Sequence, residues 1–180
     1  AAGPAGSGVG ETGWARLQFV DKKDPTRIAS EMEWQSLSPD EAQRGRSHIS
    51  EPRFWIYPED GRTVHVQAKQ ATVFMPDQQS EPESGRLYGG SLIRVFSAGA
   101  GGERRAIDLE QDKPEVLIST ETITFDSALG EITMPTRCEI LTPHLTKTAA
   151  NLRLNINELQ RRLELLEAGP GEMRYLLSQR

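Results

Sequence analysis

The sequence has few of the residues on which most chemical sites depend. Cys138 is the only cysteine among 180 residues, which excludes an intramolecular disulfide and a zinc site built on several cysteines. The histidines, His48, His65 and His144, lie in separate segments without the close spacing of a metal-binding pair. No apolar run approaches the roughly 20 residues that a membrane-spanning helix needs. We therefore expect no metal and no cofactor, and we expect the histidines to lie at the surface or on a sheet face.

Charge and glycine patterns give no support for nucleic-acid binding or catalysis. The net charge is −5, with both signs interspersed, unlike the basic patch of a nucleic-acid-binding protein. The glycine-rich runs at 6–10 and 99–102 do not connect a strand to a helix, as a phosphate-binding loop requires. Cys138 lies in an alternating apolar segment, which is typical of a small buried side chain. We expect no catalytic residue, no enzyme activity and no nucleic-acid partner.

Length and composition predict one domain with a modest core. Hydrophobic residues make up 36% of the chain, below the usual share for a compact domain. Residues 1–13 are small, rich in glycine and nearly uncharged, and they lack the basic and apolar regions of a signal peptide. We interpret them as a flexible leader, followed by a single domain at 14–180, and our hypothesis for the leader is that it is the stub left by a removed signal or membrane anchor.

Short alternating segments dominate the chain from Trp14 onward. Arg62–Ala68 shows the pattern clearly, with valines and an alanine at every second position, and Asp60-Gly61 before it is typical of a hairpin turn. Similar segments recur at roughly 8–12-residue spacing, which predicts an all-β fold of about ten strands. Two segments resemble helices instead. Ser38 and Pro39 could begin a short helix, and 157–168 fits either a helix or a strand, since strong helix formers follow a strictly alternating stretch.

Several short motifs, in their order and spacing, resemble the OstA/LptC-type domain of the lipopolysaccharide transport proteins. The resemblance covers residues 52–167. The motifs are Pro52-Arg53-Phe54, Asp60-Gly61-Arg62-Thr63-Val64, Gln67-Ala68-Lys69-Gln70-Ala71, Gly85-Arg86-Leu87-Tyr88-Gly89-Gly90-Ser91-Leu92, Ser119-Thr120-Glu121-Thr122-Ile123-Thr124-Phe125-Asp126 and Gly130-Glu131-Ile132-Thr133.

The resemblance implies both a fold and a function. It implies a β-jellyroll of two facing antiparallel sheets with an apolar interior, located in the periplasm and anchored to the inner membrane through a segment outside this chain. Its partners would be lipopolysaccharide or a similar glycolipid, an inner-membrane ABC transporter, and other jellyroll transport proteins joined by edge-strand pairing. The expected function is a lipid-binding and bridging scaffold in glycolipid transport to the outer membrane.

Alternation within the strands predicts which side chains face the interior and would bind lipid. A purely structural envelope domain that binds protein partners through its strand edges is the alternative function, and it predicts a filled core without a cavity. The predicted interior residues are Phe54, Ile56, Val64, Val66, Val73, Leu92, Ile118, Ile123, Phe125, Ile132, Ile140, Leu152 and Leu154.

Overall fold

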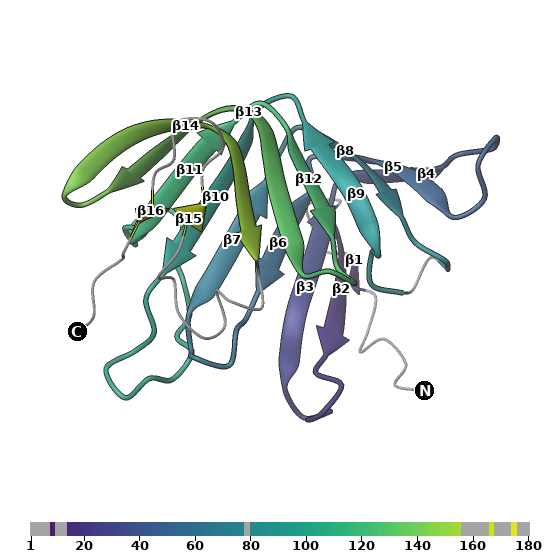
Figure 1. The fold of residues 1–180 in the computed structure, drawn as a ribbon. Helices are drawn as coiled ribbons and strands as arrows, with labels where there is room; N and C mark the ends of the chain where they lie inside the picture. The colour runs from purple at the N-terminus through teal and green to yellow at the C-terminus, as the bar shows by residue number, and fades with distance from the viewer. Residues whose placement is uncertain (1–7, 10–13, 78–79, 156–165, 168–173, 176–180) are drawn as a thin grey trace.

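The computed structural model describes residues 8–9, 14–77, 80–155, 166–167 and 174–175. These residues form strands, turns and loops without a helix, which confirms the all-β prediction for them (Figure 1). The strands are β1 (Gly8–Val9), β2 (Ala15–Val20), β3 (Ile28–Trp34), β4 (Ser36–Pro39), β5 (Arg46–Ser50), β6 (Arg53–Ile56), β7 (Thr63–Gln67), β8 (Gln70–Phe74), β9 (Ser84–Tyr88), β10 (Ser91–Phe96), β11 (Val116–Thr120), β12 (Ile123–Asp126), β13 (Glu131–Thr142), β14 (Leu145–Asn155), β15 (Leu166–Glu167) and β16 (Arg174–Tyr175).

Two-residue connections join β7 to β8 and β9 to β10, and in each case the two strands lie in different parts of the sheet. Only Ala68 and Lys69 separate β7 from β8, and only Gly89 and Gly90 separate β9 from β10. The two glycines have φ values of 82° and 89°, a conformation that residues with a side chain rarely adopt. This pair therefore lets the chain bend sharply between two strands that continue in different directions.

The strands form one antiparallel sheet in the order β1-β2-β3-β6-β7-β10-β11-β13-β12-β9-β8-β5-β4. The long strand β13 connects two halves of this order, because Cys138–Leu141 pairs with β11 and Glu131–Thr133 pairs with β12. A register shift between Met134 and Arg137 bends β13 between these two pairings. We call the part from β1 to β11 the first half and the part from β12 to β4 the second half.

The two halves face each other across one apolar core. In the first half, cross-strand neighbours form an unbroken interior row from Leu17 on β2 to Ile140 on β13. In the second half a matching row runs from Leu37 on β4 to Ile123 on β12. Contact between the halves is direct, since the rings of Phe54 and Phe125 lie 6.1 Å apart. The period-2 alternation of the sequence produces these rows.

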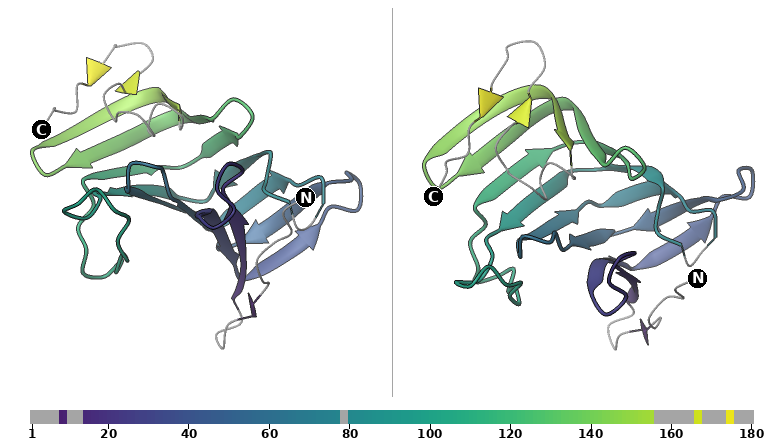
Figure 2. Two further views of the ribbon diagram at one scale, coloured as in Figure 1. Left: turned by 90° about the horizontal axis from the view of Figure 1, so that it is seen from below. Right: turned by 60° about the horizontal axis from the view of Figure 1, so that its bottom comes forward.

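The β13–β14 hairpin lies at one end of the molecule and the β4–β5 hairpin at the other (Figures 1 and 2). A jellyroll is a more specific arrangement of strands than an all-β fold with two facing halves, and it remains a prediction. The short helix predicted at Ser38 and Pro39 is wrong, because β4 pairs with β5 over these residues.

Both ends of the chain lie largely outside the described residues. Gly8 and Val9, within the predicted leader, pair with Arg16 and Ala15 of β2; the remaining leader residues are not described. In the ambiguous segment at 157–168, only Leu166 and Glu167 are described, and they form the strand β15.

His65 lies on a sheet face, as predicted, but it is fully buried there. His65 on β7 is 0% exposed, because β7 is covered on both faces. The Trp55 ring lies 4.3 Å from the imidazole, and Arg94 of β10 pairs beside it. Burial, reinforced by the nearby charges of Arg94 and Arg53, lowers the pKa of His65 to about 3. His65 is therefore neutral in the folded protein at ordinary pH.

This burial predicts an acid-dependent loss of stability. In the unfolded chain His65 takes up a proton near pH 6.5, whereas the folded protein resists protonation down to about pH 3. The free energy of unfolding should therefore fall with pH across this window, by about 1.4 kcal/mol per pH unit for this one group. Urea unfolding of the wild type and of His65→Gln between about pH 6 and about pH 4.5 measures the difference, because both proteins carry the same carboxylates and the effect of their titration cancels in the comparison. Parallel pH dependences in the two proteins would contradict it.

Candidate functional site

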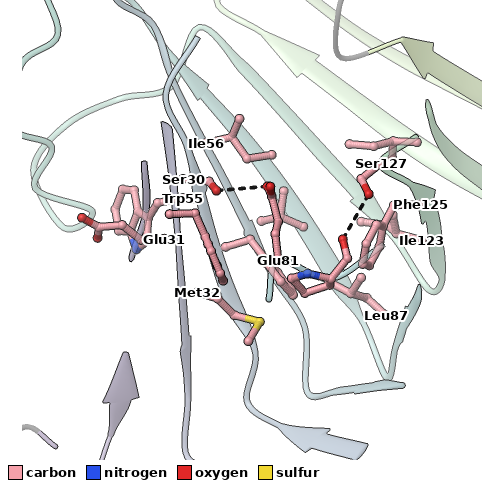
Figure 3. Close-up of a pocket in the computed structure, with 15 residues that line it drawn as sticks. Ser30, Glu31, Met32, Trp55, Ile56, Glu81, Leu87, Ile123, Phe125 and Ser127 are labelled. Atoms are coloured by element: carbon pink, nitrogen blue, oxygen red, sulfur yellow. Dashed lines mark hydrogen bonds between the residues drawn. The ribbon is translucent and has the colours of Figure 1, made fainter. Parts of the chain in front are cut away.

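An apolar cavity of about 100 Å³ lies between the two halves of the sheet. Its walls come from β2, β3, β6 and β7 on one side and from β9, β12 and β13 on the other (Figure 3). Almost all of its lining is apolar. The apolar side chains that line it are Phe19, Met32, Phe54, Ile56, Val66, Pro82, Leu87, Ile123, Phe125 and Ile132.

A glycine next to Phe125 shapes one wall of the cavity. Gly85 of β9 is the cross-strand neighbour of Phe125. A Cβ atom at position 85 would lie 2.7 Å from Cε1 of Phe125 and 2.8 Å from the carbonyl oxygen of Thr72. The absence of a side chain at Gly85 therefore leaves room for the Phe125 ring, which reaches across to Phe54.

We predict that Gly85→Ala destabilises the protein through this contact. The new methyl group meets a backbone oxygen as well as a ring, so strand β9 must shift. Such overpacking typically costs about 1–3 kcal/mol. Urea unfolding measures the change, with Arg86→Ala on the exposed face of the same strand as the control, for which a change within about 0.5 kcal/mol is expected. If the two variants unfold at the same urea concentration, Gly85 has no such role.

Polar contacts surround the mouth of the cavity. The Ser30 hydroxyl donates a hydrogen bond to Oε1 of Glu81 at 3.2 Å, and the Ser127 hydroxyl donates to the carbonyl oxygen of Pro82 at 3.2 Å (Figure 3). Ser127 also donates to the carbonyl oxygen of Glu83 at 2.8 Å. The residues just before β9 are thus held against both halves beside the opening.

The rim of the mouth carries an excess of negative charge. A wider polar pocket adjoins the apolar cavity and shares Ser30, Ile56, Glu81 and Ser127 with it. The charged residues that line this outer pocket are Lys22, Glu81, Glu83 and Asp126. Three carboxylates against one ammonium group give the rim a negative potential, which acts on any ligand that enters.

The structure brings together at the cavity six of the thirteen residues that were predicted to be interior. Nine of the thirteen belong to the buried core, and Phe54, Ile56 and Phe125 pack against it. Those that line the cavity are Phe54, Ile56, Val66, Ile123, Phe125 and Ile132. The others that lie in the core, away from the cavity lining, are Val64, Val73, Ile118, Ile140, Leu152 and Leu154.

Leu92 is the one residue that was wrongly placed inside. It pairs with Gln67 and Ser119 and lines a polar groove on the outer face of the sheet. The segment Leu92-Ile93-Arg94-Val95-Phe96 has apolar residues on both phases of the alternation, so the pattern alone is ambiguous. Ile93 and Val95 occupy the interior positions.

Several lining residues escaped the sequence analysis. Phe19 and Leu87 lie in alternating segments, so their period-2 spacing could have identified them. Met32 lies in a mostly polar stretch with no clear alternation, although it is 0% exposed. Ser30 and Glu81 are 51 positions apart, and no local pattern predicts that they meet.

The described residues offer little for other kinds of chemistry. They contain no group of three or more His, Cys, Asp or Glu side chains arranged to hold a metal. The prediction that Cys138 is a small buried side chain is confirmed, since it is 1% exposed and burial raises the pKa of its thiol. In the described part of the chain, no helix has the length and apolar character needed to cross a bilayer.

Comparison with known proteins leaves the family open. No protein-family model and no curated protein matches the sequence. The resemblance to the OstA/LptC-type domain is therefore carried only by its short motifs, and what it implies about function remains a proposal.

Proposed function

We propose that this protein is a lipid-binding and bridging scaffold of the periplasm, which takes part in the transport of lipopolysaccharide or a related glycolipid to the outer membrane. The observation that carries the proposal is the apolar cavity between the facing halves of the sheet, with its polar mouth. An acyl chain is the ligand part that gains most from such a lining, because burying each CH₂ group contributes about 0.8 kcal/mol.

The size of the cavity limits how an acyl chain can be held. An engineered cavity of about 150 Å³ lined by similar side chains binds benzene, so the 100 Å³ cavity here matches only the end of an acyl chain. The rest of the ligand would extend through the mouth, past Ser30 and Ser127. Brief, partial enclosure of this kind suits a protein that passes its ligand to a neighbour, such as an ABC transporter on one side and a similar β domain on the other.

Binding of a fluorescent acyl-chain probe tests the proposal. Saturable binding to the purified protein, with displacement by lipopolysaccharide or another glycolipid, supports it. If the probe does not bind, or if lipids do not displace it, the cavity is only a packing defect and the proposed lipid function is wrong.

The acidic rim predicts that a positively charged ligand binds more tightly than a negatively charged one. With Glu81, Glu83 and Asp126 around the mouth, dodecylamine should bind several-fold more tightly than dodecanoate, which has the same chain and the opposite charge. Glu83→Lys should narrow this difference, and high salt should do the same. Tighter binding of dodecanoate would contradict the prediction. Because the rim is acidic, a glycolipid bound in this cavity would place an uncharged part of its own structure next to these carboxylates.

The edge of β14 favours a second function, that of a structural envelope domain that binds protein partners. β14 pairs with β13 along its length, while its other edge pairs, within the described residues, only at Arg153. A strand with a free edge can accept a strand from another protein. Proline substitution at Thr148 should abolish such an interaction and leave acyl-probe binding unchanged, which separates this function from lipid binding.

A further inference from the structure

A second pocket, which is polar, lies on the outer face of the first half of the sheet, opposite the apolar cavity, with which it shares Glu31 and Trp55 as lining residues. It measures about 160 Å³ and lies beneath the segment that connects β10 to β11. Arg104 of this segment contacts the face of the Tyr57 ring, with 3.3 Å between the guanidinium carbon and the ring centroid. Trp55 and Thr63 line the floor of the pocket from β6 and β7.

Two side chains that line this pocket carry buried polar atoms without a hydrogen-bonding partner among the described residues, Nε1 of Trp55 and Oγ1 of Thr63. Nε2 of His65, which packs against Trp55, and Nη1 of Arg62 are the other such atoms in the described part of the chain. Thr63 is 1% exposed and His65 is 0% exposed. Leaving such a group without a partner costs about 1–3 kcal/mol, and folded proteins contain few of them. Two such atoms in the lining of one pocket suggest that a ligand completes the site.

The unpartnered atoms are all able to donate a hydrogen bond. The indole Nε1–H can only donate, and the threonine hydroxyl can donate. Nδ1 of His65 lies 3.5 Å from Nη1 of Arg94, which can only donate. Since the imidazole is neutral, Nδ1 is the acceptor and the proton is on Nε2. A complementary ligand therefore offers hydrogen-bond acceptors to these groups.

The charges around the pocket favour a negative ligand. The lining contains three arginines, Arg16, Arg104 and Arg105, and one carboxylate, Glu31. Glu31 lies 3.3 Å from Arg16, which also pairs with Glu33 at 2.7 Å. Arg105 pairs with Asp112 at 3.0 Å. Among the described residues no carboxylate forms a salt bridge with Arg104, so its charge remains available at the opening.

We infer that this outer pocket binds an oxyanion, such as a phosphate or carboxylate group, through the Arg104 guanidinium and the Trp55 and Thr63 donors. Guanidinium and N–H groups form short, strong hydrogen bonds with such oxygens. His65, directly behind Trp55, positions the indole ring through their 4.3 Å contact. The inference does not depend on the apolar cavity and would stand if the lipid function failed.

Nuclear magnetic resonance of the full chain tests the inference through the indole N–H of Trp55. Trp55→Phe identifies its resonance among the three tryptophans. Titration with inorganic phosphate, and in parallel with acetate, should shift this resonance saturably with at least one of the two, whereas sodium chloride at the same ionic strength should not. Arg104→Gln should abolish the saturable shift, and Arg86→Gln, on the exposed face of β9, should retain it.

Three outcomes would overturn the inference. They are an indole resonance that neither oxyanion moves, a shift that chloride reproduces, and a saturable shift that survives in Arg104→Gln. In each case the unpartnered donors would be satisfied by water, and the pocket would have only a structural role. Because Arg104 is exposed, its substitution should leave the fold intact, which the unchanged resonances of core methyl groups would show.

Discussion

Replacing Ser30 by tryptophan will weaken the binding of an acyl-chain probe at least about tenfold, a change of about 1.4 kcal/mol. Ser30 occupies an interior position of β3 at the mouth of the cavity, where its hydroxyl contacts Glu81. An indole at this position reaches into the space that the chain end would fill, while the partly open surroundings limit the strain. Fluorescence titration with the same probe measures the loss.

Ser30→Ala provides the matched control for this prediction. It removes the hydrogen bond to Glu81 and fills no space, so the probe should bind as tightly as to the wild type. Equal probe binding by Ser30→Trp and Ser30→Ala would mean that the chain enters elsewhere or binds only to the surface. Urea unfolding of each variant shows that the comparison is made between folded proteins.

Met32→Ala should produce the largest loss of stability among single truncations at the cavity. Met32 is 0% exposed and lies in the interior row, between Leu17 and Phe54. Truncation of a buried methionine removes apolar contacts and leaves a void, which typically costs about 2–5 kcal/mol. The midpoint of urea unfolding measures the effect.

Leu141→Ala is the control, because it truncates an exposed apolar side chain instead of a buried one. Leu141 is 42% exposed and faces outward on β13, so its truncation should cost less than about 1 kcal/mol. If Met32→Ala were as mild as Leu141→Ala, the halves of the sheet would not be packed together as described. Met32→Ala should also enlarge the cavity and thereby tighten probe binding, which a loss of packing alone would not do.

The sequence predicted the strands and most of the interior because both depend on local alternation. In segments such as β7, hydrophobic residues at every second position identify one face without knowledge of the fold. The pattern failed at Leu92, where apolar residues occupy both phases and only the pairing with β7 and β11 decides which side faces inward. Alternation placed His65 correctly on the face of β7 opposite Val64 and Val66, but it could not show that this face is covered.

The candidate site could be predicted only in part. Its apolar lining follows from alternation, but its existence depends on the fold of one half onto the other and on space left by Gly85. The contacts that surround its mouth, such as Ser30 with Glu81, join residues far apart in the chain. The outer pocket was also beyond prediction, since a glycine-rich stretch at 97–105 gives no sign that Arg104 contacts Tyr57.

Photocrosslinking from inside the cavity tests the proposed lipid function most directly. A photoreactive amino acid is placed at Ile123, which lines the cavity, and in a second protein at Arg86, which is exposed on the outer face. Each protein is irradiated with cell-envelope glycolipids. We predict that the probe at Ile123 captures glycolipid and that the probe at Arg86 captures little. Equal labelling at the two positions, or no lipid at Ile123, would contradict a lipid-binding role for this cavity.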